Sequence, residues 1–95
     1  MEQYEHLHLV LGFVKEKNLD QILPLFPKEA HYYFCKPNIP RGLDAEILQD
    51  KAASFGLKGE VYASVTKALE GAKQKALKTD LIFIGGSTFT VAEVL

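Results

Sequence analysis

The sequence has only one cysteine, Cys35, among its 95 residues. A single cysteine cannot form a disulfide within the chain, which excludes a small secreted scaffold held together by disulfides. A reducing compartment is the default that follows, and we expect a cytoplasmic protein. Long apolar runs are also lacking, so the sequence predicts neither a membrane-spanning helix nor the apolar region of a signal peptide.

The sequence also lacks an excess of charge of either sign. Eleven basic and twelve acidic side chains leave a formal net charge of -1. Domains that bind nucleic acid typically carry a basic stripe or basic residues interleaved with aromatics, and neither occurs here. We therefore predict no nucleic-acid partner and no membrane partner. A chain of this length forms one domain, which buries about 60 to 70% of its unfolded surface.

The common nucleotide-binding motifs are missing as well. The glycine-rich dinucleotide fingerprint does not occur in "GFVKEK" (residues 12–17) or in "GGSTFT" (residues 85–90), and the Walker pattern is absent. A phosphoryl-accepting receiver domain would need acidic residues where this chain has Lys15, Lys17 and Ser64. The chain by itself is therefore not expected to hold a nucleoside triphosphate in the common ways.

The sequence does contain a regular alternation of strand and helix patterns. Strands are predicted at residues 7–13, 30–35, 59–63 and 81–84, the last as a strand buried on both faces. Helices are predicted after the N-caps Asn18, Asp44, Ser64 and Ser87, with Pro24 weakening the first and Gly56 ending the second. The residues expected to face the core are Ile47, Leu48, Ala52 and Phe55 in the second helix and Val65, Ala68, Leu69, Ala72, Ala76 and Leu77 in the third.

This alternation predicts the α/β class. Strands separated by helices of about ten residues form βαβ units with right-handed crossovers and a parallel sheet. We expect a three-layer, Rossmann-like domain with a mainly parallel sheet of about four strands in the order 3-2-1-4 and helices on both faces. Ligands of such folds bind beyond the carboxyl ends of the strands, where the chain reverses direction between the first strand and the last.

Two segments meet at that predicted point and suggest a site for an anion. Lys15 and Lys17 follow the first strand, and Gly86 and Ser87 form a turn that leads into a helix N-terminus. Free backbone N–H groups and the positive end of a helix dipole attract negative charge. Arg41, in the loop after the second strand, lies on the same rim. The alternatives are a well-capped turn and a solvated arginine.

The three histidines and the cysteine are further candidate sites. His6 and His8 lie two residues apart on one face, and His31 begins the neighbouring strand, so a metal site is conceivable. No carboxylate partner is evident from the sequence, and we expect these rings to be satisfied by backbone or solvent, with no metal bound. Cys35 is expected to be a small buried hydrophobe and not a nucleophile.

Four segments together resemble a known family. They are "LHLVLGFVKEKN", "HYYFCKPNIPRGLDAEIL", "GEVYASVTKAL" and "DLIFIGGSTFTVAEVL", and they span nearly the whole chain. In this order they resemble the C-terminal domain of bacterial folylpolyglutamate synthase/dihydrofolate synthase, of the Mur ligase superfamily. The departures are mild: Gly42 stands where the family often has alanine, and Ala92 replaces a frequent glycine.

The resemblance implies an ATP-dependent ligase that joins glutamate to folate or dihydropteroate through an acyl phosphate. ATP and Mg²⁺ would be held by an N-terminal ATPase domain, whose phosphate-binding loop and Asp-Gly-Ala-His-Asn-Pro stretch are missing from residues 1–95. We therefore expect these residues to be a single C-terminal domain that is inactive alone, with no bound cofactor and no catalytic residue of its own. Lys15, Lys17, Arg41, Gly86 and Ser87 would close over the substrate.

A second interpretation remains open from the residues. The chain could be a stand-alone α/β module that uses the same rim for a small acidic ligand or a protein partner. The coding sequence upstream of Met1 discriminates between the two interpretations. A continuous frame with a phosphate-binding loop supports the ligase, whereas a true start codon supports the module.

Overall fold

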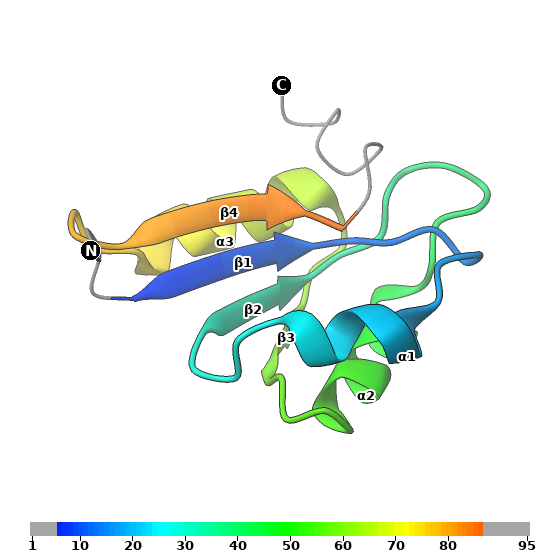
Figure 1. Cartoon of the computed structure of the whole chain (residues 1–95). Helices are drawn as coiled ribbons and strands as arrows, with labels where there is room; N and C mark the ends of the chain where they lie inside the picture. The colour runs from blue at the N-terminus through cyan, green and yellow to red at the C-terminus, as the bar shows by residue number, and fades with distance from the viewer. Residues whose placement is uncertain (1–5, 87–95) are drawn as a thin grey trace.

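The computed structural model describes residues 6–86, and its centre is one four-stranded sheet (Figure 1). The strands are β1 (Leu7–Leu11), β2 (His31–Phe34), β3 (Gly59–Val61) and β4 (Leu81–Gly85). Their order is β3-β2-β1-β4, and every neighbouring pair is parallel. The predicted topology is confirmed.

Helices cover both faces of this sheet. Along the chain they are α1 (Leu19–Ile22), the 3-10 helix η1 (Leu23–Leu25), α2 (Ala45–Ala53) and α3 (Val65–Lys75). In Figure 1, α3 lies behind the sheet, whereas α1 and α2 lie on the opposite face, beside β2 and β3. The predicted three layers are confirmed. The helix predicted after Ser87 lies outside the described residues.

Alternation along the central strands builds a separate core on each face. Leu9 and Leu11 of β1 pack on the α1 and α2 side, whereas Val10 packs on the α3 side. On β2, Tyr32 packs on the α1 and α2 side, and Tyr33 packs on the α3 side. Successive side chains of a strand point to opposite faces, so two short apolar strands supply both cores.

The first predicted helix is shorter than expected. It is divided into α1 and η1, with Pro24 in the first turn of η1. Proline has no N–H to donate to the preceding turn, and the chain tightens into a 3-10 turn there. Asn18 occupies the N-cap position as predicted, but its side chain makes no capping hydrogen bond.

The second and third helices begin at the predicted residues. Ser64 caps α3 by accepting a hydrogen bond from Lys67 N–H at 3.1 Å. Gly56, with a φ of 80°, provides the left-handed residue that follows α2. Two predictions of burial are wrong: Ile47 is 53% exposed, because the core side of α2 is taken by Leu48 and Ala52, and Leu77 is 63% exposed, because α3 ends before it.

The prediction that the last strand is buried on both faces is also wrong. Ile82 and Ile84 pack against the α3 core, but Leu81 and Phe83 are 47% and 50% exposed. The reason is that β4 is an edge strand, and α1 and α2 lie toward the other edge of the sheet. An apolar run does not distinguish an edge strand from a central one. Within residues 6–86, no helix has the length and apolarity needed to cross a membrane.

Candidate functional site

The loops that follow β1 and β2 are joined at the carboxyl end of the sheet. Lys15 N–H donates to Arg41 O at 2.7 Å, and Leu43 N–H donates to Phe13 O at 2.8 Å. Between these two bonds, Val14 and Gly42 form an isolated antiparallel bridge. The backbones of Lys15 and Arg41 are therefore adjacent, although 26 positions of sequence numbering separate them.

The end of β4 lies against the first of these loops. Gly12 N–H donates to Gly85 O at 3.3 Å. Gly86 has a φ of 98°, and a Cβ added to it would lie 2.5 Å from Gly12 O, so only glycine fits there. Lys15, Arg41 and Gly86 thus share one end of the sheet, as the sequence predicts. Ser87 lies outside the described residues.

We call Lys15, Lys17 and Arg41 the cationic rim. All three residues are exposed, and Glu16 is the acidic residue that stands between the two lysines in the sequence. Lys17 N–H donates to Val14 O at 3.2 Å, which closes a turn after the bridge. Lysine and arginine side chains can form charge-assisted hydrogen bonds to carboxylate or phosphoryl oxygens. The rim can therefore bind and orient an anion, but nothing in its geometry makes it a nucleophile or a base.

A hollow of about 760 Å³ lies beside the rim, between the loop after β2 and the start of α3. Its polar lining includes Lys36, Asn38, Ser64 and Thr66. Lys36 also forms an exposed ion pair with Asp44 at 3.2 Å. The sequence pattern singled out Arg41 in this loop but did not predict the hollow. The available signal was the loop itself, which follows a strand and precedes a capped helix on the side where ligands of this fold class bind.

Gly42 is required by the shape of the same loop. A Cβ at this position would lie 2.4 Å from Pro37 O and 3.1 Å from Ile39 O. The loop is closed by hydrogen bonds from Ile39 N–H to Pro37 O and from Gly42 N–H to Ile39 O. Glycine at this position, where the resembling family often has alanine, therefore lets the chain fold back tightly just after Arg41.

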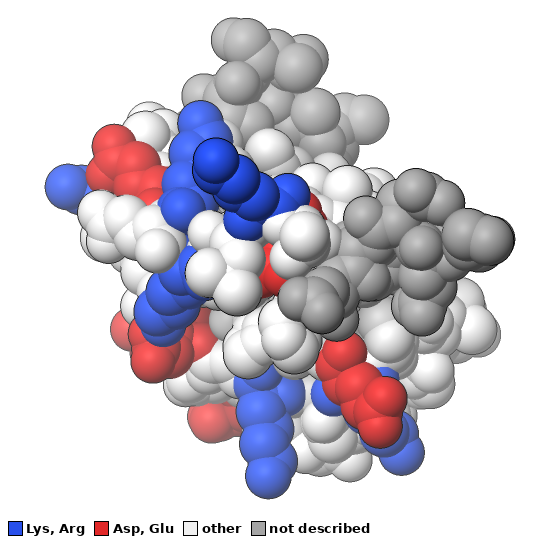
Figure 2. Space-filling model, turned by 90° about the vertical axis from the view of Figure 1, so that its left-hand side faces the viewer, with Lys and Arg blue, Asp and Glu red and all other residues white. Residues whose placement is uncertain are grey.

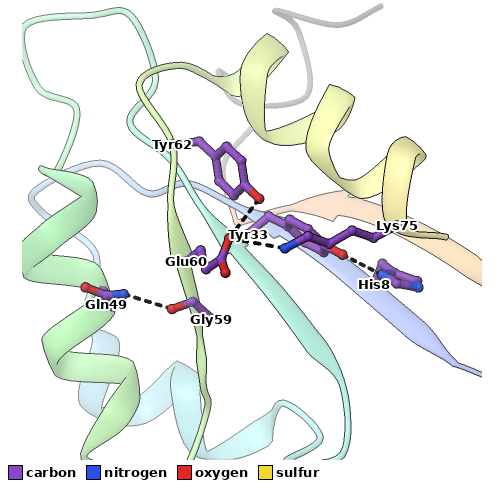
Figure 3. Close-up of polar contacts among 7 residues, drawn as sticks. All are labelled: His8, Tyr33, Gln49, Gly59, Glu60, Tyr62 and Lys75. Atoms are coloured by element: carbon purple, nitrogen blue, oxygen red, sulfur yellow. Dashed lines mark hydrogen bonds and ion pairs between the residues drawn. The ribbon is translucent and has the colours of Figure 1, made fainter.

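A buried polar network occupies the opposite end of the sheet. His8 Nε2 lies 2.8 Å from Asp80 Oδ2. His8 Nδ1 lies 2.7 Å from the Tyr33 hydroxyl (Figure 3). Burial raises the pKa of Tyr33, which keeps its hydroxyl protonated. Because the carboxylate accepts, we assign the ring hydrogen to Nε2, and Nδ1 accepts from Tyr33. The expectation that no carboxylate pairs with these histidines is wrong for His8.

The network continues to the surface through α3. Lys75 Nζ donates to Glu60 Oε1 at 3.1 Å and lies 5.7 Å from the centre of the Tyr33 ring (Figure 3). The hydrogen bond from Lys75 holds the pKa of Glu60 below its ordinary value. The Tyr62 hydroxyl donates to the same carboxylate at 3.3 Å. These contacts hold β3 against the last turn of α3.

No group of three potential ligands for a metal ion occurs among residues 6–86. Both ring nitrogens of His8 are occupied by protein partners, so His8 has none left to bind a metal. Cys35 is fully buried, and its thiol donates to Leu11 O at 3.4 Å. A buried thiol with a backbone acceptor is typical of a structural cysteine.

Comparison with known proteins identifies the family of this fold. Residues 1–88 match the family described as "Mur ligase, glutamate ligase domain". A "Probable bifunctional folylpolyglutamate synthase/dihydropteroate synthase" from Haloferax volcanii is 34% identical over 91 residues, which is 95% of this chain and 11% of that protein.

Two solved structures from Yersinia pestis have the same architecture. A ligand-free bifunctional folylpolyglutamate synthase/dihydrofolate synthase is 26% identical, with a TM-score of 0.82 over 94% of this chain and 21% of that one. The enzyme of that name complexed with AMPPNP and a manganese ion is 24% identical, with a TM-score of 0.78 and the same coverage. The chain therefore spans about a tenth to a fifth of the length of these relatives.

Proposed function

The chain belongs to the Mur ligase family of glutamate ligase domains, and we propose that it is the C-terminal domain of a folylpolyglutamate synthase, an ATP-dependent ligase that joins glutamate to a folate. Folylpolyglutamate synthase is the activity that the names of the relatives have in common, whereas the second activity differs between them. The proposal concerns the whole protein, of which this chain supplies one domain. Its partner is the N-terminal ATPase domain, and its expected setting is the cytoplasm.

One observation carries this proposal. The pairing of the loops after β1 and β2 brings Lys15 and Arg41 together, at the end of the sheet where β4 and Gly86 also finish. Glutamate brings carboxylates, and its amine attacks a carbonyl whose oxygen becomes negative in the transition state. The proposed role of the cationic rim is to bind a substrate carboxylate and to offset that negative charge. Closure of this domain over the substrate would also exclude water.

The proposal places the site for ATP and Mg²⁺ outside this chain. The sequence has no phosphate-binding glycine loop, and no cluster of three metal-ligating side chains occurs in the described part. In the proposed enzyme both groups bind to the N-terminal ATPase domain. The Yersinia pestis enzyme with AMPPNP and manganese supports such a site in the longer protein.

Steady-state ligation by the full-length protein tests the role of the rim. Arg41→Gln removes a charge-assisted donor, and we expect kcat/KM for glutamate to fall roughly tenfold, which corresponds to about 1.4 kcal/mol of transition-state binding. Ser87→Asp tests the predicted turn in the same assay. Aspartate caps a helix as well as serine does but repels an anion, so kcat/KM for glutamate should fall if the turn binds an anion. The control is Lys73→Gln, an exposed lysine in the last turn of α3.

Thermal unfolding of each variant separates loss of function from loss of fold. A folded Arg41→Gln enzyme with unchanged kcat/KM for glutamate would contradict the role of the rim. If full-length protein with the native sequence shows no folate-dependent and glutamate-dependent release of ADP, the proposed function itself is wrong.

A further inference from the structure

A second hollow lies at the amino ends of β1 and β2, at the other end of the strands from the cationic rim. Its volume is about 560 Å³, and its titratable lining residues are His6, Lys28, Glu29, His31 and Lys58. Figure 2 views the molecule onto this end and shows lysine or arginine side chains spread across it, with carboxylates between them. We propose that this hollow binds a small phosphorylated metabolite through its phosphoryl group.

The charge of the hollow favours an anion. Lys28 and Lys58 are exposed, and no ion pair engages either of them within the described residues. Other lysines of the chain are neutralised, since Lys51 pairs with Asp20 and Lys75 pairs with Glu60. Among the described residues, the lining therefore has a net positive charge even when both of its histidines are neutral.

The histidines of the hollow are held in place by the buried network. The His31 ring stacks on His8, with the ring centres 4.9 Å apart and the planes 17° apart. His6 meets the edge of the same ring at 5.9 Å. His8 is itself fixed by hydrogen bonds to Asp80 and Tyr33. A ring that is already ordered loses little entropy when a ligand binds to it.

Lys28 is also positioned by the fold. A Cβ built at Gly56 would lie 3.4 Å from Lys28 Cδ, so the stem of the lysine crosses the turn after α2 at the glycine. The hollow thus combines two exposed lysines with two imidazoles that contact other rings.

The size and chemistry of the hollow select the ligand. Two lysines repel a metal cation, and His8 has no free nitrogen for one. The volume lies within the range of about 300 to 1,000 Å³ that is typical of small-molecule sites, and it exceeds what a lone phosphate fills. A phosphate ester, with its organic part in the remaining space, fits these properties better than the free ion.

The surroundings of the His6 and His31 rings are separate from the cationic rim. The charged and titratable groups that surround the two rings are His8, Lys28, Glu29, Tyr33, Lys58, Glu60, Lys75 and Asp80. None of these eight groups belongs to the cationic rim, so the inference does not depend on the proposed ligase activity.

The first experiment uses sulfate, a dianion of the same shape as a phosphoryl group. The ring signals of His6, His8 and His31 are followed by NMR during titration with sulfate at neutral pH. We expect saturable shifts of the His6 and His31 signals. Shifts that grow linearly with sulfate would overturn the site.

Two protein variants and a comparison of two phosphate ligands test the site further. The double variant Lys28→Gln/Lys58→Gln should lose most of the affinity, whereas Lys67→Gln, an exposed lysine at the start of α3, should retain it. Equal losses in both proteins would mean a general charge effect and would overturn the site. Glucose 6-phosphate should bind several-fold more tightly than inorganic phosphate. Equal affinity for the two would overturn the assignment to a phosphate ester.

Discussion

Asp80 is the buried carboxylate that organises the amino end of the sheet. Its side chain is 2% exposed, and its Oδ2 accepts hydrogen bonds from Leu77 N–H at 3.0 Å and from His8 Nε2 at 2.8 Å. These two bonds hold the pKa of Asp80 below its ordinary value. Oδ1 has no hydrogen-bond partner among the described residues. The charge-assisted bonds to Oδ2 therefore offset the desolvation of the whole group.

Replacing this carboxylate should lower stability in a way that depends on pH. Because the folded pKa is depressed, the contribution of Asp80 is fully present above the unfolded value of about 3.9 and is lost as the pH falls through the folded value. We expect Asp80→Asn to lower the free energy of unfolding at neutral pH, because it removes the charge that strengthens both hydrogen bonds. Urea denaturation at several pH values measures this difference.

The difference between the two proteins should shrink as the pH falls below the ordinary aspartate pKa. Asp50→Asn is the control, since Asp50 is exposed and makes no ion pair within residues 6–86. A constant difference between native protein and Asp80→Asn from neutral to acidic pH would contradict the role of the charge.

At the scale of elements, α2 and α3 both begin at good capping residues, but only in α3 does that side chain form a capping hydrogen bond. Ser64 Oγ accepts from Lys67 N–H and closes the first turn of α3. Asp44 occupies the N-cap of α2 without a side-chain cap bond, and its carboxylate instead forms an exposed ion pair with Lys36. The N-cap residue therefore contributes differently to the stability of α2 and of α3.

A pair of substitutions measures this difference. We expect Ser64→Ala to lower the free energy of unfolding by about 1 kcal/mol, because it removes a capping bond. Asp44→Ala should cost no more than about 0.5 kcal/mol, since an exposed ion pair contributes little. Chemical denaturation of both variants under the same conditions tests the prediction. Equal losses would mean that Asp44 caps α2 in solution.

On the scale of the whole molecule, the two ends of the sheet carry different chemistry. The carboxyl end holds the cationic rim, which we propose faces the substrate of a ligase. The amino end holds the His8 and Asp80 network and the basic hollow above it. Parallel strands place all their carboxyl ends on one side, so a single sheet keeps the two proposed sites apart.

The chain alone should not catalyse ligation. Purified residues 1–95, supplied with ATP, Mg²⁺, glutamate and a folate, should release no ADP above background, because the sequence has no phosphate-binding glycine loop. A preparation of Arg41→Gln purified in parallel identifies contamination, since a contaminating enzyme would give the same trace in both. Folate-dependent release that disappears in Arg41→Gln would overturn the prediction.

Local patterns in the sequence determined most of the elements, the strand order and the family. The strand and helix periods, Ser64 as a cap, Gly56 as a stop and the four resembling segments are all read within short windows. The meeting of Lys15, Arg41 and Gly86 at one rim also followed from the strand order, because a parallel sheet fixes where each loop begins. Their roles in binding, and that of Ser87, stay predictions.

Only the tertiary structure decided which distant residues meet and which faces stay open. His8 and Asp80 are 72 residues apart, and no local pattern links them. The exposure of Phe83 depends on β4 being at the edge, and that of Ile47 on which side of α2 meets the sheet. Periodicity records that a residue is apolar, whereas burial depends on what other segments pack against it. The buried pair and the basic hollow above it therefore exist only in the folded chain.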